Sequence, residues 1–298
     1  MKEIALELKS LPLWRIWLSD LLELTKFRLS FMVVVSTFAG FYMGANGEIN
    51  TWLLIHTLLG TAGVACGAAV LNQVLEAAAD RRMHRTQDRP IAAGRVSEQS
   101  ALCFGSSLAA LGLVYLLLAA NFDVFCTALL TLFSYLFVYT PLKKLTPLNT
   151  LIGAIPGALP IVIGYVAANR QLNATVLTLF LILFLWQMPH FLAIAWLYRE
   201  DYARGGFKML TLNDANGKLT AWKSVLYTLL LIPCSLAPYW LGMSGPWYLV
   251  SALIGNALYL LASLGFAFNP SPASARKLFL ASIFYLPFVL ATLAICKL

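Results

Sequence analysis

The sequence predicts an all-α, polytopic membrane protein with nine transmembrane helices and a cytoplasmic N-terminus. Three observations support this prediction. Of the 298 residues, 60% are hydrophobic and only 11% are charged, whereas a soluble domain carries about 25% charged residues. Several apolar runs reach the roughly 20 residues that a helix needs to cross a bilayer. Basic residues also alternate along the chain between dense loops and nearly empty ones.

The nine apolar runs are the expected transmembrane helices. Their ranges are 28–45, 52–76, 101–120, 122–140, 149–167, 174–197, 223–242, 247–267 and 276–296. We expect residues 1–298 to form a single transmembrane domain. The second and sixth helices run in the same direction, and each ends in a long charged loop. This suggests a four-helix unit used twice, over 28–140 and 149–267, followed by the helix 276–296.

The distribution of basic residues predicts the orientation of the chain. All but Arg170 and Lys297 of the 21 lysines and arginines fall in the N-terminal segment or in alternate loops. Because basic residues concentrate on the cytoplasmic side, the N-terminus should be inside and the C-terminus outside. The net charge of +8 therefore indicates topology and anionic partners at one membrane face, rather than nucleic acid.

Small residues and prolines predict how the helices pack. Three pairs of glycines have the GxxxG spacing that lets helix backbones approach closely. The expected helix 149–167 contains Pro156 and Pro160 and should kink. The five cysteines are scattered without a CxxC motif, so we expect neither a disulfide nor a zinc site. The glycine pairs are Gly40 with Gly44, Gly63 with Gly67, and Gly153 with Gly157.

A first polar cluster lies at the end of the second helix. Asn72, Glu76 and Asp80 are spaced i, i+4, i+8 and share an arc of about 80° on a helix. Their oxygens suit a hard cation such as Mg²⁺, and arginines of the kind that bind phosphate follow. An ordinary positively charged helix end is the alternative, but polar groups on an apolar helix are usually functional. The arginines are Arg81, Arg82, Arg85, Arg89 and Arg95.

A second cluster follows the sixth helix. Glu200 and Asp201 are adjacent, so they point in different directions on a helix. We expect one of them to ligate a metal and the other to cap the helix or pair with Arg204. Tyr198 and Arg199 belong to the same cluster. Taken alone, the cluster also fits a solvated helix end.

Three further residues are candidate site residues, and each also has an ordinary structural explanation. His190, within the sixth helix, is a hydrogen-bonded core residue, a haem ligand or a proton-transfer group. Lys143 and Lys144 are either ordinary basic residues of a cytoplasmic loop, or they bind diphosphate if that loop folds over the site.

Three blocks together resemble the UbiA-type intramembrane prenyltransferases over nearly the whole chain from about Leu24. The blocks are NQVLEAAADRRMHRTQDRP, YTPLKKLTPLNTLIGAIPGALPIVIGY and MPHFLAIAWLYREDYARGGFKML. The R-T-x-x-R-P and R-E-D-Y-x-R-G-G runs resemble the branch of that family that modifies haem. The resemblance implies nine helices around a central cavity that opens to the lipid.

The resemblance also implies which residues form the site. Asn72, Glu76 and Asp80 take the place of one Mg²⁺-binding motif, and Glu200 and Asp201 take the place of the other. Glu76 stands where many members have Asp, and the second motif lacks a DxxxD, so the number of metal ions stays open. Asn72, Glu76, Asp80 and Asp201 are the implied catalytic residues. The implied substrate-binding residues are Arg85, Arg89, Lys143, Lys144, His190, Tyr198, Arg199 and Arg204.

The implied reaction transfers farnesyl from farnesyl diphosphate to the 2-vinyl group of haem B, with addition of water, to give haem O. Mg²⁺ is the implied cofactor and haem B a substrate. The implied partners are the lipid bilayer and a downstream haem A synthase or oxidase assembly, and the implied location is the bacterial inner membrane. One alternative is prenylation of an aromatic quinone precursor. A transporter is the other, since Pro-interrupted helices occur there, although the charges at one face argue against it.

Overall fold

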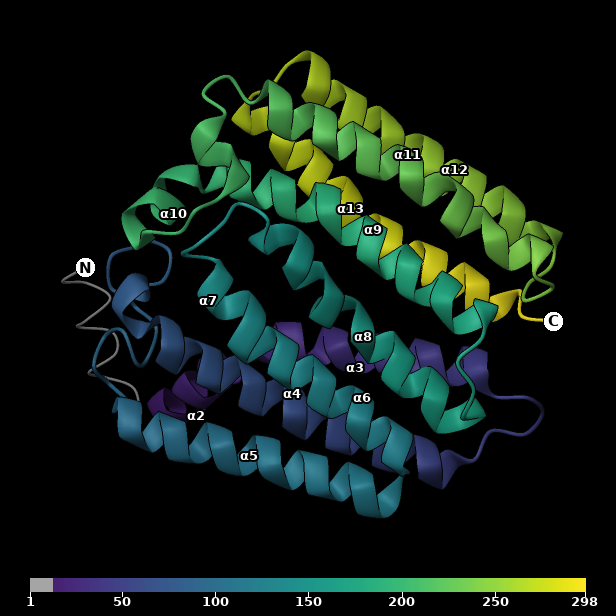
Figure 1. The fold of residues 1–298 in the computed structure, drawn as a ribbon, viewed down its shortest axis with the longest axis horizontal. Helices are drawn as coiled ribbons and strands as arrows, with labels where there is room; N and C mark the ends of the chain where they lie inside the picture. Colours follow the sequence, from purple (N-terminus) through teal and green to yellow (C-terminus); the bar gives the residue numbers. More distant parts are fainter. Residues whose placement is uncertain (1–12) are drawn as a thin grey trace.

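Long helices make up nearly all of the computed structural model, which describes residues 13–298 (Figure 1). Within this part of the chain, nine helical spans are long and apolar enough to cross a membrane, which confirms the predicted fold class. The spans are α3 (Phe27–Gly44), α4 (Thr51–Asp80), α5 (Glu98–Ala119), α6 to α7 (Phe122–Leu142), α8 (Asn149–Asn169), α9 (Ala174–Leu197), α11 (Lys218–Trp240), α12 (Pro246–Phe268) and α13 (Pro272–Ile295).

Four shorter elements were not expected. The helix α2 (Leu13–Leu24) precedes the first span, and α10 (Arg199–Gly205) follows α9. A 3₁₀ turn covers Leu210–Asn213. A π-helical segment, Ser134–Tyr139, joins α6 (Phe122–Phe133) to α7 (Thr140–Leu142). The basic residues Lys2 and Lys9, which contributed to the predicted orientation, lie outside the described residues.

Two predicted helix ends differ from the structure for the same reason. The helix α4 continues to Asp80 rather than ending near residue 76, and α11 begins at Lys218 rather than near residue 223. In both cases the additional turn carries charge, so it is not part of the apolar run even though it is helical. The longer α4 places the whole first polar cluster on one helix.

The helices lie side by side, with α4 and α5 along one edge of the bundle and α11 and α12 along the other (Figure 1). The charged loops 81–97, 143–148 and 198–217 meet at one end, together with the short connection 269–271. The connections 45–50, 120–121, 170–173 and 241–245 lie at the opposite end. We call the first of these the charged end. Which end faces the cytoplasm stays a prediction, as do the central cavity and the four-helix repeat.

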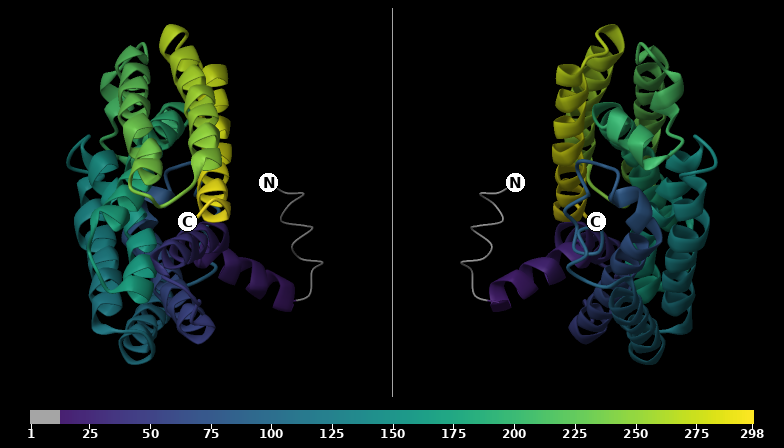
Figure 2. Two further views of the ribbon diagram at one scale, coloured as in Figure 1. Left: turned by 90° about the vertical axis from the view of Figure 1, so that its right-hand side faces the viewer. Right: turned by 90° about the vertical axis from the view of Figure 1, so that its left-hand side faces the viewer.

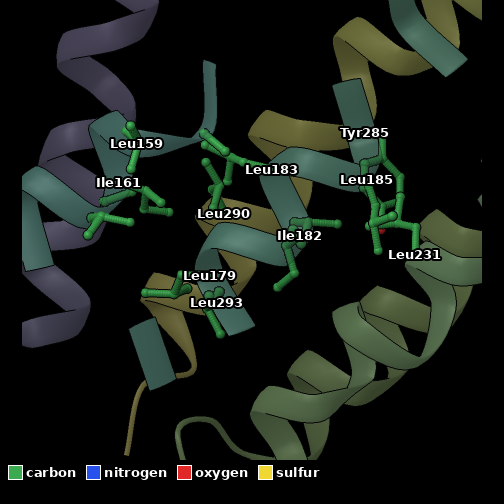
Figure 3. Packing of buried hydrophobic residues seen from close by; sticks show 14 of the residues in the cluster. Leu159, Ile161, Leu179, Ile182, Leu183, Leu185, Leu231, Tyr285, Leu290 and Leu293 are labelled. Carbon is green, nitrogen blue, oxygen red and sulfur yellow. The ribbon is translucent and has the colours of Figure 1, made fainter. Parts of the chain in front are cut away.

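The buried core centres on α8, α9 and α13 (Figure 3). Ile161 of α8, Leu179 and Ile182 of α9, and Leu293 of α13 are almost fully buried. Because lipid is as apolar as these side chains, their burial gives little hydrophobic driving force in a membrane. Close van der Waals packing between helices must therefore provide much of the stability.

Glycines bring α3 and α8 into backbone contact. A Cβ atom on Gly40 would overlap the carbonyl oxygen of Ile161, and one on Gly164 would overlap the carbonyl oxygen of Thr37. Gly67 approaches the α5 backbone in the same way, at Gly105 and Ala109. The packing role predicted for the GxxxG glycines is confirmed at these contacts. Both prolines of α8 lie inside a continuous helix, and the kink stays a prediction.

We expect Gly164→Ala to destabilise the protein by about 1–3 kcal/mol, because the added methyl group forces the α3 and α8 backbones apart. The matched control is Gly265→Ala, since a Cβ atom there meets nothing within 4 Å. Unfolding of both purified variants in mild detergent, followed by circular dichroism, measures the difference. Equal stability of the two variants would contradict the proposed contact.

Candidate functional site

Three polar side chains are buried near the C-terminal end of α4. Asn72, Glu76 and Asp80 are 0%, 5% and 1% exposed. All three lie on one helix, as their spacing predicted. Because a buried charge is stable only when it is paired and hydrogen-bonded, these groups require partners from elsewhere in the chain.

Each of the three polar groups has one basic partner, and each partner comes from a different segment. In every pair the basic nitrogen lies 2.8 or 2.9 Å from the oxygen that it contacts. One guanidinium nitrogen of the arginine, Nη1, contacts both oxygens of its carboxylate. The pairs are Lys26 with Asn72, Lys143 with Glu76, and Arg89 with Asp80.

Lys26 was not predicted as a site residue. It lies between α2 and α3 and adopts a left-handed backbone conformation, with φ of 45° and ψ of 53°. Non-glycine residues rarely adopt this conformation, and such strain tends to occur at functional positions. The turn directs the lysine side chain toward α4. In the sequence, Lys26 is one of several basic residues of the N-terminal segment that predict the orientation of the chain.

The π-helical segment Ser134–Tyr139 positions the neighbours of Lys143. Directly after it, the hydroxyl of Thr140 donates a hydrogen bond to the carbonyl oxygen of Tyr135 at 2.8 Å. The same hydroxyl oxygen accepts a hydrogen bond from the amide of Asn72 at 3.2 Å. The Lys143 nitrogen lies 4.5 Å from the centre of the Tyr139 ring. Short π-helices of this kind occur frequently at functional sites.

The two lysines have opposite shifts in pKa. Burial, and then the nearby Arg89, lowers the pKa of Lys26 to about 7. Burial also lowers the pKa of Lys143, but the oxygens of Tyr139 and Glu76 outweigh it and raise the pKa above its usual value. The carboxylate of Glu76 thus favours the charged form of Lys143, whereas the neutral amide of Asn72 offers Lys26 no such compensation.

The second cluster places Asp201 and Glu200 in different surroundings. Asp201 is buried, and one of its carboxylate oxygens accepts a hydrogen bond from Arg204 at 2.6 Å and another from the backbone N–H of His84 at 3.0 Å. Burial raises the pKa of Asp201, but these hydrogen bonds outweigh it and hold the pKa below its usual value. Glu200 is exposed and lines a recess of about 220 Å³ with Arg199 and Arg204. Asp201 also lines this recess, and of the two carboxylates it is the one with a hydrogen bond to the loop that follows the first cluster, within residues 13–298.

Aromatic rings support two arginines of the charged end, the exposed Arg85 and the half-buried Arg199. The guanidinium carbon of Arg85 lies 4.8 Å from the centre of the Tyr198 ring and 5.6 Å from that of Tyr202. The guanidinium carbon of Arg199 lies 4.3 Å from the ring centre of Trp196. Stacking of this kind fixes a guanidinium while leaving its N–H groups free for an anion. Lys144 is exposed, in contrast to Lys143.

His190 lies apart from both charged clusters. Its Nδ1 atom is 2.7 Å from the hydroxyl of Ser282 on α13. The imidazole stacks on Trp186 and Phe279, with ring centres 5.2 Å away in each case. Within residues 13–298, its Nε2 atom takes part in no hydrogen bond. The ring orientation is therefore fixed, and one nitrogen stays free.

The oxygen donors of the two clusters fit a magnesium ion that is completed by its substrate. Within the described part of the chain, no three His, Cys, Asp or Glu side chains form a ready-made metal site. Mg²⁺ is usually bound through one or two carboxylates together with waters and substrate phosphates, rather than in an all-protein cage. The amide and the two carboxylates of α4 are donors of this kind, and Asp201 is tied to the loop after α4 through the backbone N–H of His84.

Comparison with known proteins identifies the family. The profile of the UbiA prenyltransferase family matches residues 33–288. The chain belongs to this family. A protein of Solibacter usitatus named protoheme IX farnesyltransferase is 43% identical over 91% of this chain and 96% of its own length. A protein of the same name from Aquifex aeolicus is 40% identical over 93% of this chain and 95% of its own length.

Solved structures of UbiA proteins share the fold. A digeranylgeranylglyceryl phosphate synthase superposes with a TM-score of 0.78 at 22% identity, over 94% of this chain and 98% of its own. A UbiA homologue from Archaeoglobus fulgidus, bound to GPP and Mg²⁺, superposes with a TM-score of 0.64 at 16% identity, over 92% and 99% of the two chains. At these identities, the likeness establishes the fold and not the substrates.

We expect Arg89→Met to destabilise the protein by about 3–5 kcal/mol, because it leaves the Asp80 carboxylate buried and unpaired. The matched control is Arg81→Met, which breaks an ion pair with Glu98 in which both side chains are about half exposed. Such exposed pairs contribute about 0–1 kcal/mol.

Denaturant unfolding of both variants in detergent measures this contrast. Adding Asp80→Asn to Arg89→Met should restore part of the loss, because it removes the unpaired charge. Equal, small losses in the two single variants would show that the Arg89 pair is solvated like the Arg81 pair.

Proposed function

We propose that the chain transfers the farnesyl group of farnesyl diphosphate to the 2-vinyl group of haem B, with addition of water, to give haem O and diphosphate. The observation that carries this proposal is the agreement between relatives and site. Relatives named protoheme IX farnesyltransferase are 40–43% identical over more than nine-tenths of this chain. The charged end also combines oxygen donors for a cation with basic groups for a diphosphate.

Asn72, Glu76 and Asp80 are proposed to hold Mg²⁺ together with Asp201. Bound there, the ion would neutralise the charge that develops on a departing diphosphate. Asp201 is a better candidate than Glu200, because it is buried and contacts the loop after α4, whereas Glu200 is exposed.

The basic partners of these groups are proposed to bind the diphosphate. Lys26, Lys143 and Arg89 each contact one of the polar groups of α4. They therefore gather basic nitrogens beside the proposed metal ligands, where the oxygens of a diphosphate would accept hydrogen bonds from them. Arg85 and Arg199, held on aromatic rings, are proposed to bind the phosphates from the exposed side. Tyr198, Arg204 and Lys144 complete the proposed set.

The proposed reaction breaks one bond of the diphosphate substrate and forms two new bonds on the vinyl group. The C1–oxygen bond of farnesyl diphosphate breaks, and its electron pair leaves with the diphosphate. The terminal vinyl carbon of haem B forms a bond to C1, which leaves a cation on the vinyl carbon next to the porphyrin ring. Water adds to this carbon and releases one proton. The chain contributes by holding the leaving group with fixed positive charge and by shielding the farnesyl group from bulk water among apolar helices.

The location and partners that this function implies are also proposals. The protein would act in the inner membrane of a bacterium. Its product would pass to a haem A synthase or directly to an oxidase under assembly.

Purified protein in liposomes should incorporate label from farnesyl diphosphate into haem B and not into 4-hydroxybenzoate. Mass spectrometry of the extracted haem should show the addition of one farnesyl group and one hydroxyl group. Incorporation into 4-hydroxybenzoate alone would overturn the proposal in favour of an aromatic acceptor.

Asp80→Ala should lower turnover by on the order of 100-fold or more, since several kcal/mol of charge stabilisation depend on the metal. EDTA should abolish prenyl transfer by the protein without substitutions, and added Mg²⁺ should restore the activity. The control is Glu98→Ala, which removes an exposed carboxylate outside the site. Full activity of Asp80→Ala at a normal level in the membrane would remove Asp80 from the mechanism.

His190 is proposed to ligate the haem iron through its free Nε2 atom, with Ser282 fixing the ring through Nδ1. His190→Ala should then shift the Soret band of bound haem B and weaken its binding, and Ser282→Ala should do so to a smaller extent. A lower rate with an unchanged spectrum would instead indicate a water-orienting role. No change in spectrum, binding or rate would make His190 a packed core residue.

A further inference from the structure

The helix α2 (Leu13–Leu24) stands out from the rest of the bundle. It leaves the bundle sideways instead of running alongside the other helices (Figure 2). It is too short and too polar to be one of the nine spans. A left-handed residue, Lys26, allows the sharp change of direction between α2 and α3.

One face of α2 is apolar and uncovered. Trp14 and Trp17 are 61% and 68% exposed, and Leu18 and Leu22 are 43% and 42% exposed. At about 100° per residue, these four side chains fall within an arc of about 140°. An exposed apolar stripe with two tryptophans on one helix face indicates a surface that meets something apolar.

The side of α2 that carries Asp20 and Glu23 contacts the rest of the protein. Asp20 forms an ion pair with Arg95 at 2.8 Å, and Glu23 lies 3.6 Å from the same guanidinium. The side-chain amide of Gln73 donates hydrogen bonds to the carbonyl oxygens of Glu23 and Leu24 at 3.0 and 2.8 Å. These contacts fix the protein-facing side of α2 against α4 and the loop that follows it. These contacts set the rotation of α2 about its own axis, and the apolar stripe therefore faces away from the protein.

The same contacts fix the position of α2 along the long axis of the bundle. Gln73 lies on α4 where the spanning helix approaches its charged end, and α3, the first span, begins at Phe27. Phe27 and Phe31 of α3 are 56% and 50% exposed, as expected of side chains on a surface that faces lipid. The helix α2 therefore lies where the apolar surface of the bundle meets the charged end, which is the boundary between acyl chains and headgroups.

We propose that α2 is an interfacial helix that lies in the plane of the membrane, with Trp14, Trp17, Leu18 and Leu22 embedded at the acyl-chain boundary. A helix with one apolar face, a polar opposite face and tryptophans at the edge is well suited to this region. Arg15 and Ser19 are exposed beside the stripe, about 20° and 60° beyond Leu22 around the helix. The guanidinium carbon of Arg15 lies 5.3 Å from the ring centre of Trp14, at the edge of the stripe, where a cation can reach the headgroups. The partner of this surface is the lipid bilayer itself.

Environment-sensitive labels on the two faces of α2 test the proposal in the full chain. A version in which the five cysteines are replaced by serine or alanine carries one new cysteine, either Trp17→Cys or Ser19→Cys, labelled with NBD. Both proteins are placed in vesicles of phosphatidylethanolamine and phosphatidylglycerol, and prenyl transfer is measured to verify that they are folded.

The label at position 17 should emit at shorter wavelength and be quenched by lipids brominated near the headgroup end of the acyl chain. The label at position 19 should instead be quenched by aqueous iodide. Quenching of both labels by iodide alone would place α2 in water and overturn the proposal. Protection of position 17 from both quenchers would also overturn it, because a protein surface or a second copy of the chain would then cover the stripe.

Discussion

Charge neutralisation at the end of α4 is the constraint on which the rest of the structure depends. An amide and two carboxylates are buried on one helix where it leaves the membrane, and such groups are tolerated only with partners. The partners come from the turn before α3, from the loop after α4 and from the segment after α7. Three separate parts of the chain are thereby tied to one helix. The same charges that stabilise the folded bundle are the ones proposed to receive a diphosphate.

Much of the fold could be predicted from the sequence, because a membrane span is a local property. A run of about 20 apolar residues is recognised without knowledge of its neighbours, and the nine predicted spans correspond to the nine in the described part of the chain. The spacing of Asn72, Glu76 and Asp80 is likewise local. The helix α2 was missed because its amphipathic pattern is short and its overall hydrophobicity is modest, so it lacks the signal of a span.

The partners of the site could not be predicted, because pairing across the bundle is not a local property. Lys26 is 46 residues from Asn72, and Lys143 is 67 residues from Glu76. Each reads as an ordinary basic residue at a membrane boundary. The choice between Glu200 and Asp201 also depended on the folded structure, since it rests on which of them contacts the backbone of His84. The positive φ of Lys26 could not be predicted from the sequence, because lysine is not a residue that favours this conformation.

The π-helical segment Ser134–Tyr139 has a consequence for how this site can diverge. A π turn closes its hydrogen bonds over five residues instead of four, so it holds one more residue than an α-helix of the same length. Loss of that residue would rotate Thr140 and Lys143 by about 100° around the helix axis, while leaving the outer part of the span in register with its neighbours. A single-codon insertion or deletion there would change which side chains face the site without disturbing the transmembrane packing. Length variation in this segment, rather than substitution alone, is thus a route by which one bundle can acquire a different substrate.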